Sequence, residues 1–131
     1  MYALDTNTLS YFLRGEGEVA RRLNAATADQ LGLPSVVAYE LRYGLKRVGA
    51  GPRRLAELNQ LLGALKPLPF DADAAEIAAQ IRVELQRRGE SIGNFDLMIA
   101  ATALAHHAIL VTRNRREFER VPLLQLEDWF G

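Results

Sequence analysis

Three carboxylates, Asp5, Glu40 and Asp96, have the chemistry to hold a metal ion if the fold brings them together. Asp5 directly follows the apolar segment 2–4, Glu40 lies near the start of a helical pattern, and Asp96 lies two residues after Asn94. Mg²⁺ is a hard cation that binds carboxylate oxygens together with water and phosphate. Acids gathered without a basic partner repel one another, and a cation relieves that repulsion. We therefore predict a magnesium site formed by these three acids.

Each of these acids also has a purely structural interpretation. Asp5 can cap the helix that follows it, with Thr6 or Asn7 sharing that task or supporting the site. Glu40 and Asp96, near helix starts, complement the helix dipole. Only the combination of all three favours a metal site. A metal held there would bind a phosphodiester, lower the pKa of water and stabilise the departing oxygen.

A second polar segment follows the apolar residues 108–111 and contributes further candidates. Thr112 and Asn114 are predicted to bind phosphate or a water of the metal. Arg113, Arg115 and Arg116 are predicted to hold a nucleic-acid backbone. Glu119 is a further candidate acid. A polar loop at a helix start is the alternative interpretation of this segment.

The elements that must position these residues alternate between extended and helical patterns. Short strands are predicted at 2–5, 30–33, 66–70, 108–111 and 123–126, and helices at 8–13, 18–26, 36–48, 55–65, 71–89, 94–107 and 116–120. Strands separated by helices favour an α/β fold with a parallel sheet and right-handed crossovers. In such sheets ligands bind at the carboxyl ends of the strands, where Asp5 is expected.

Four local features refine this arrangement. Ser35 and Asp71 are predicted to be N-caps of the helices that follow them. Two prolines in the segment 66–70 predict an edge strand. Residues 97–101 are apolar nearly all round, which predicts a buried helix.

Composition restricts the class of protein. The 131 residues are expected to form one domain, 1–131. The chain has 49% hydrophobic residues and no cysteine, which fits a globular protein and excludes thiolate metal sites. A net charge of zero argues against a strongly basic nucleic-acid binder, although arginines form local clusters. With no signal peptide or membrane-spanning run, a cytoplasmic protein without membrane contact is expected.

Four segments in register carry a resemblance that covers residues 4–129. They are Leu4-Asp5-Thr6-Asn7-Thr8, Tyr39-Glu40-Leu41-Arg42-Tyr43-Gly44, Ile92-Gly93-Asn94-Phe95-Asp96-Leu97-Met98-Ile99-Ala100-Ala101 and the run from Val111 to Pro122. In these segments and in the ending Leu126-Glu127-Asp128-Trp129, the chain resembles the PIN-domain ribonucleases, specifically the VapC-type toxins of bacterial toxin–antitoxin pairs.

The resemblance implies an α/β/α sandwich around a central, mainly parallel sheet. It also implies RNA cleavage, often of tRNA, that depends on Mg²⁺ or on Mn²⁺ as a substitute. The metal-site acids of the family fall on Asp5, Glu40 and Asp96, whereas Asn114 stands where many PIN domains have a further Asp. The partners implied are a second copy of the chain, in a homodimer, and a VapB-type antitoxin.

Three other functions are alternatives to nuclease activity. A non-catalytic RNA-binding PIN domain is favoured only by Asn114. A phosphorylated signalling receiver needs a lysine after its fifth strand, and none follows Lys66. A haloacid-dehalogenase-like phosphatase needs a second Asp two residues after the first, where this chain has Asn7.

Overall fold

Five parallel strands form one central sheet in the computed structural model, which describes all residues, 1–131. The strands are β1 (Tyr2–Leu4), β2 (Leu31–Pro34), β3 (Lys66–Leu68), β4 (Ile109–Val111) and β5 (Leu126–Glu127). Their order in the sheet is β3-β2-β1-β4-β5, and every neighbouring pair is parallel. The predicted parallel sheet is confirmed, and the proline-containing β3 is an edge strand, as expected.

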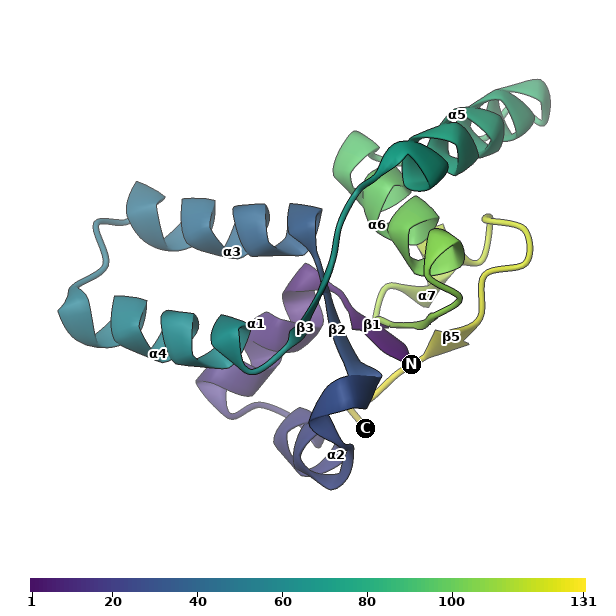
Figure 1. Cartoon of the computed structure of the whole chain (residues 1–131). Coiled ribbons are helices and arrows are strands. Elements are labelled where there is room, and N and C mark those ends of the chain that lie inside the picture. Colours follow the sequence, from purple (N-terminus) through teal and green to yellow (C-terminus); the bar gives the residue numbers. More distant parts are fainter.

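Helices cover both faces of this sheet. They are α1 (Thr6–Arg14), α2 (Val19–Ala25), η1 (Ala28–Gln30), α3 (Ser35–Arg47), α4 (Pro52–Gly63), α5 (Ala72–Arg87), α6 (Asn94–Ala105) and α7 (Arg115–Phe118). Figure 1 shows α1 to α4 on one side of the strands and α5, α6 and α7 on the other. The α/β/α sandwich expected from the resemblance is therefore confirmed.

The centre of the sheet contains a topological switch point between β1 and β4. The chain leaves β1 through α1 on one face toward β2, whereas it leaves β4 through α7 on the other face toward β5. Tyr2 is in register with Ile109 and Leu4 with Val111, so both strands end at the same level. Loops that diverge from neighbouring strands leave a crevice between them, which is where ligands bind in open α/β sheets.

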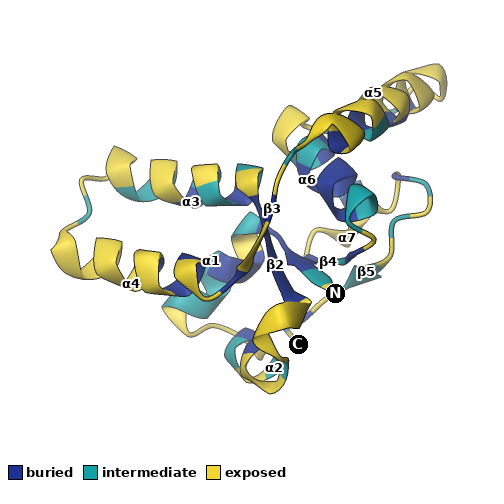
Figure 2. Cartoon of the chain, in the orientation of Figure 1, coloured by how far each residue is buried: buried dark blue, intermediate teal, exposed yellow.

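The core is a single cluster of 28 buried hydrophobic residues from both layers and the sheet. Within it, α6 lies between α5 and the sheet, and Figure 2 shows its middle turns buried while the outer faces of α3, α4 and α5 are exposed. The prediction of a buried helix at 97–101 is confirmed. The first turn of α6, which carries Asp96, is partly open to solvent.

Most helix ends agree with the sequence patterns, and two elements differ. Asp71 caps α5 through a 3.0 Å hydrogen bond from the backbone N–H of Ala74. The prediction for Ser35 is wrong, since Pro34 is the N-cap of α3 and Ser35 is already helical. The last strand begins at Leu126 rather than at residue 123, because Leu123 has a positive φ of 67° that interrupts extended backbone.

Candidate active site

Asp5 is fixed at the end of β1 by bonds to both neighbouring elements. Its Oδ1 accepts a 2.8 Å hydrogen bond from the backbone N–H of Thr8, so it caps α1, and its own N–H donates to the carbonyl of Val111 in β4 at 3.2 Å. The side chain is 5% exposed. Asp5 can therefore cap α1 and be a candidate metal ligand at the same time, because the capping hydrogen bond holds its carboxylate at the switch point.

Glu40 reaches the same crevice from the second turn of α3. Its Oε1 accepts a 2.6 Å hydrogen bond from the hydroxyl of Thr6, the residue directly after Asp5. This bond links residues 34 positions apart and ties α3 to the start of α1. The hydroxyl of Thr6 therefore holds the carboxylate of Glu40 next to the start of α1, where Asp5 lies.

Asp96 and Glu117 face each other from the first turns of α6 and α7. Glu117 accepts two 3.0 Å hydrogen bonds, from the backbone N–H of Gly93 to Oε1 and from the side-chain amide of Asn114 to Oε2. The negative charge of Glu117 raises the pKa of Asp96, so the two carboxyls are close neighbours. Glu117 is thus a fourth acid at the crevice that the sequence reasoning did not nominate, and Asn114 orients it.

The position of Glu117 depends on a buried neighbour. The helix α7 has four residues, too few to be stable alone. Phe118 is 1% exposed, and burying such a ring contributes roughly 1.5–3 kcal/mol, which anchors α7 to the core. Asn114 at the N-cap and Glu117 three positions later is a helix-start pattern in the sequence that points to this acid.

The acids influence one another electrostatically. Burial raises the pKa of Asp5, an increase that hydrogen bonds from Thr112 and Thr8 oppose and the charge of Glu40 reinforces. Burial, together with the charges of Glu117, Glu40 and Asp5, raises the pKa of Asp96 to about 7. The Gly93 N–H is the main cause that lowers the pKa of Glu117.

No cation neutralises this group of acids by direct contact. The seven ion pairs of the structure involve none of the four crevice acids, Asp5, Glu40, Asp96 and Glu117. Arg120 is close enough to lower the pKa of Glu117 but forms no ion pair with it. Four neighbouring carboxylates without a paired cation favour protonation or cation binding.

The donor set fits a hard divalent cation such as Mg²⁺. All four groups offer carboxylate oxygens. The pKa values of Asp5 and Asp96 are raised, and a bound cation would lower them. No three acidic or histidine side chains converge closely enough to enclose an ion by themselves. This arrangement is compatible with Mg²⁺, which usually retains several waters and takes only one or two carboxylates.

The remaining predicted residues lie around the crevice in different roles. Thr112 is fully buried directly after β4, and its hydroxyl accepts a 3.0 Å hydrogen bond from the backbone N–H of Asn114. Arg113 lies over the ring of Phe130, 3.7 Å from its centroid. Asn7 is exposed in the first turn of α1 and forms no hydrogen bond with the acids.

Arg115 and Glu119 form a pair with each other. Their Nε and Oε1 atoms lie 3.7 Å apart and both side chains are exposed. The structure therefore places Glu119 against an arginine of its own helix, whereas Glu117 is the glutamate of this segment that meets Asp96.

Two hollows each include one of the crevice acids. One, of about 300 Å³, is lined by Glu117 and Asn114 together with Arg116 and Arg120. The other, of about 320 Å³, lies between α1, α3 and α4 and includes Thr6, Glu40, Arg14 and Arg54. Each hollow thus combines one crevice acid with two arginines.

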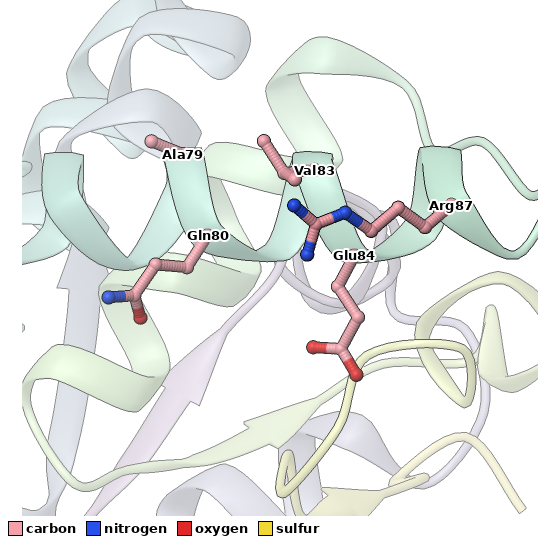
Figure 3. A pocket seen from close by; sticks show the side chains of 5 residues that line it. All are labelled: Ala79, Gln80, Val83, Glu84 and Arg87. Atoms are coloured by element: carbon pink, nitrogen blue, oxygen red, sulfur yellow. The ribbon is translucent and has the colours of Figure 1, made fainter.

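A further hollow lies on the outer face of α5 and is separate from this chemistry. Figure 3 shows its five lining side chains, Ala79, Gln80, Val83, Glu84 and Arg87, all from one helix. It contains none of the four crevice acids, so its residues have no place in the candidate active site.

Comparison with known proteins agrees with this combination of fold and acids. The sequence pattern of the PIN domain matches residues 2–124. The tRNA(fMet)-specific endonuclease VapC of Salmonella typhimurium is 36% identical over 98% of this chain and 97% of its own length. Ribonuclease VapC2 of Rickettsia felis is 34% identical over 98% of both chains.

Solved structures give the same result. The crystal structure of DNA-bound VapBC from Salmonella typhimurium contains a chain that matches with a TM-score of 0.91 and 36% identity, over 98% of this chain and 97% of that one. The match over residues 2–124 and the shared fold therefore define a PIN-domain nuclease. Within this class, the chain belongs to the VapC ribonucleases, the toxin components of VapBC toxin–antitoxin systems. None of its helices has the length and apolar character to cross a membrane.

Proposed function

We propose that this ribonuclease is a Mg²⁺-dependent endonuclease that cuts tRNA, with Mn²⁺ as a substitute ion. The observation that carries the proposal is the group of four carboxylates without an ion-pair partner at the β1–β4 switch point. The relatives support the substrate, because the Salmonella and Shigella proteins are named tRNA(fMet)-specific endonucleases. The full chain, 1–131, acts as one domain in the cytoplasm, where tRNA is found.

Asp5 and Asp96 would hold the ion, with Glu40 and Glu117 binding it directly or through its waters. A bound Mg²⁺ would supply a Lewis acid for the phosphate and lower the pKa of an attacking water. The rigidity of the site comes from the chain itself. Thr8 fixes Asp5, Thr6 fixes Glu40, and Gly93 with Asn114 fixes Glu117. An acid not engaged with the ion can accept the proton of the attacking water.

The arginines of the two hollows would hold RNA phosphates near the acids. Arg116 and Arg54 form no ion pair or side-chain hydrogen bond within the chain, so their guanidinium groups are available. Guanidinium groups match phosphate oxygens in geometry and charge. Local arginines explain how a chain of zero net charge can bind a polyanion.

Two protein partners belong to the proposal. Several similar structures are VapBC complexes, which supports a VapB-type antitoxin for this chain. The family resemblance further supports a homodimer. An antitoxin segment that covers the crevice would inhibit cleavage, and an arginine from it would match the unpaired acids.

The test is cleavage of total tRNA by the purified chain, free of antitoxin, with Mg²⁺, Mn²⁺ or EDTA, followed by sequencing of the fragment ends. We expect discrete cuts with either metal, none with EDTA, and none from a folded Asp96→Asn variant. An active Asp96→Asn variant would contradict the assignment of the site. Metal-independent binding without cleavage would support the alternative, a non-catalytic RNA-binding PIN domain.

A further inference from the structure

The guanidinium group of Arg113, in the segment directly after β4, lies against two aromatic rings. Its Cζ is 3.7 Å from the ring centroid of Phe130 and 5.7 Å from that of Tyr11 in α1. The two rings contact each other edge to face, with centroids 4.9 Å apart, and we call them the aromatic cradle. Arg113 is exposed and forms no ion pair or side-chain hydrogen bond within the chain, so its N–H donors are available.

Phe130 is itself fixed by the backbone on both sides. Its carbonyl accepts a 2.7 Å hydrogen bond from the N–H of Glu18, and its N–H donates to Oδ1 of Asp128 at 2.9 Å. A Cβ placed on Gly17 would lie 2.6 Å from the carbonyl oxygen of Phe130, so the two backbones are in close contact. Trp129, the preceding residue, is 3% exposed. The guanidinium group therefore rests on a ring that the fold holds in place.

The aromatic cradle is connected to Asp5 along α1. Asp5, Thr8 and Tyr11 follow one another at intervals of three residues, so each neighbours the next on the helix surface. The hydroxyl of Thr8 donates to the carbonyl of Val111 at 3.2 Å, which holds this side of α1 against the end of β4. A helix rises about 1.5 Å per residue, so the cradle lies roughly 9 Å along α1 from the acid.

A guanidinium group that stacks on a ring is well prepared to bind phosphate. The ring covers one face of the planar group, whereas the N–H donors point outward in its plane. These donors form a fork that matches two phosphate oxygens. An arginine that is already oriented also loses less conformational freedom when it binds, which increases its affinity for the ligand. Lysine offers neither the plane nor the fork.

We propose that Arg113 binds an RNA phosphate that flanks the phosphate at the acids, and that Phe130 is the positioning residue for this arginine. The proposal rests on the proposed nuclease function and adds a second contact point on the same strand. An acidic segment of a protein partner is the other ligand that a free guanidinium group accepts. RNA is favoured because Asp5 donates its N–H to the carbonyl of Val111, two residues before Arg113, so a strand bound at the acids also reaches this segment.

The experiment measures the binding of total tRNA in EDTA, where no metal-dependent cleavage occurs, at several salt concentrations. Arg113→Ala should weaken binding about five- to tenfold and reduce the steepness of its salt dependence by about 0.7–0.9 in the logarithmic slope, because one phosphate contact is lost. Phe130→Leu keeps the charge but removes the ring, and should weaken binding about three- to fivefold. In the Arg113→Ala background, Phe130→Leu should have an effect below about 1.5-fold, because the ring acts only through the arginine.

Two control variants keep the result specific, and thermal unfolding checks the fold of each. Phe130→Tyr retains a ring and should retain the affinity of the wild-type chain. Arg82→Ala removes another exposed arginine without an ion pair, on α5 and without an aromatic contact, and should leave affinity and salt dependence unchanged. Additive losses in the double variant would overturn the positioning role of Phe130. Unchanged tRNA binding by Arg113→Ala would overturn the whole proposal and leave an acidic protein segment as the ligand of the guanidinium group.

Single-turnover cleavage with Mg²⁺ separates this proposal from the function beneath it. Arg113→Ala and Phe130→Leu should raise the tRNA concentration for half-maximal rate about as much as they weaken binding. The rate at saturating tRNA should stay within about twofold, because neither residue contacts the reacting phosphate. A wild-type chain that cuts tRNA no better than these variants at low tRNA concentration would overturn the proposal and leave the nuclease intact. A chain that does not cut tRNA would overturn the proposed function, whereas the binding measurements in EDTA would still decide whether Arg113 holds an RNA phosphate.

Discussion

Glu117 and Glu119 lie two residues apart in one short segment, yet they have opposite surroundings. Glu119 is exposed and faces Arg115, with Nε and Oε1 3.7 Å apart. Glu117 is half-buried, accepts hydrogen bonds from neutral donors and lies against Asp96. A charge on the surface is satisfied by an exposed ion pair of little energetic value, whereas a charge in the crevice is held in place beside other acids. The difference identifies which acids are available to a metal.

The same contrast holds for the whole chain. Seven acids form the seven ion pairs, and all of them lie outside the crevice: Glu16, Glu18, Glu57, Asp71, Glu90, Glu119 and Glu127. The four crevice acids have no such partner. Replacing acids in matched pairs, one from each group, therefore tests whether the crevice is the active site.

In this comparison the largest effect on cleavage is expected from neutralising Glu117, and Glu119 in the same segment is its matched control. Glu117→Gln should lower the rate of metal-dependent tRNA cleavage about 10- to 100-fold, because it removes a charge that holds or orients the ion. Glu119→Gln should change the rate less than about twofold, because its exposed pair contributes little. Single-turnover cleavage at saturating Mg²⁺ measures both variants. Equal effects of the two substitutions would show that Glu117 has no special role.

A smaller effect is expected from pH, through Asp96. Its pKa is raised to about 7, so below that pH a proton competes with the metal for this carboxylate. The Mg²⁺ concentration for half-maximal cleavage should rise about tenfold per pH unit as the pH falls below about 7, and should level off above it. Titrations of Mg²⁺ across this range measure the effect. A flat profile would mean that Asp96 does not bind the ion, and Glu119→Gln should leave the profile unchanged.

Removing the hydroxyl that positions Glu40 should have a still smaller effect. Thr6→Val eliminates the 2.6 Å hydrogen bond to Oε1 and should lower the cleavage rate about three- to tenfold. Thr6→Ser keeps a hydroxyl and should restore most of the activity. The comparison of the two variants at saturating Mg²⁺ is the measurement, and equal activity of Val and Ser variants would exclude the positioning role.

The sequence predicts the fold because its signals are local and consistent. Asp5 ends an apolar strand and caps a helix, prolines mark the edge strand, and residues 97–101 are apolar on every side. The carboxyl ends of parallel strands lie at one edge of the sheet, and the chain continues from there into the next helices. The topology therefore brings Asp5, Glu40 and Asp96 near one another. Ser35 shows the limit, since helix boundaries shift by one residue when a proline can occupy the cap.

The choice between Glu117 and Glu119 cannot be made from local pattern alone. Both flank Phe118, and successive helical residues are about 100° apart, so the two glutamates point to opposite sides of its buried ring. Which side meets α6 depends on how Phe118 docks in the core and on the Gly93 N–H, 24 residues away. The contact of Tyr39 with Phe95 is similar, because it exists only after α3 and α6 pack together.

The smallest effect concerns stability and has opposite signs in the two groups of acids. In its folded state Asp96 has a pKa raised above the ordinary value of 3.8, so its contribution to stability is present at low pH and is lost as pH rises through about 7. Without metal, Asp96→Asn should therefore stabilise the chain at pH 8 by about 1 kcal/mol, or roughly 3–5 °C in melting temperature, after allowance for its partial exposure. The gain should be smaller at pH 5 and should vanish only below about pH 3.8, where the carboxyl is protonated in the unfolded chain as well. Glu57→Gln, which breaks the exposed pair with Arg53, should instead cost a few tenths of a kcal/mol at both pH values. Thermal unfolding in EDTA at the two pH values measures this contrast, and a destabilised Asp96→Asn chain at pH 8 would show that the crevice acids do not repel one another.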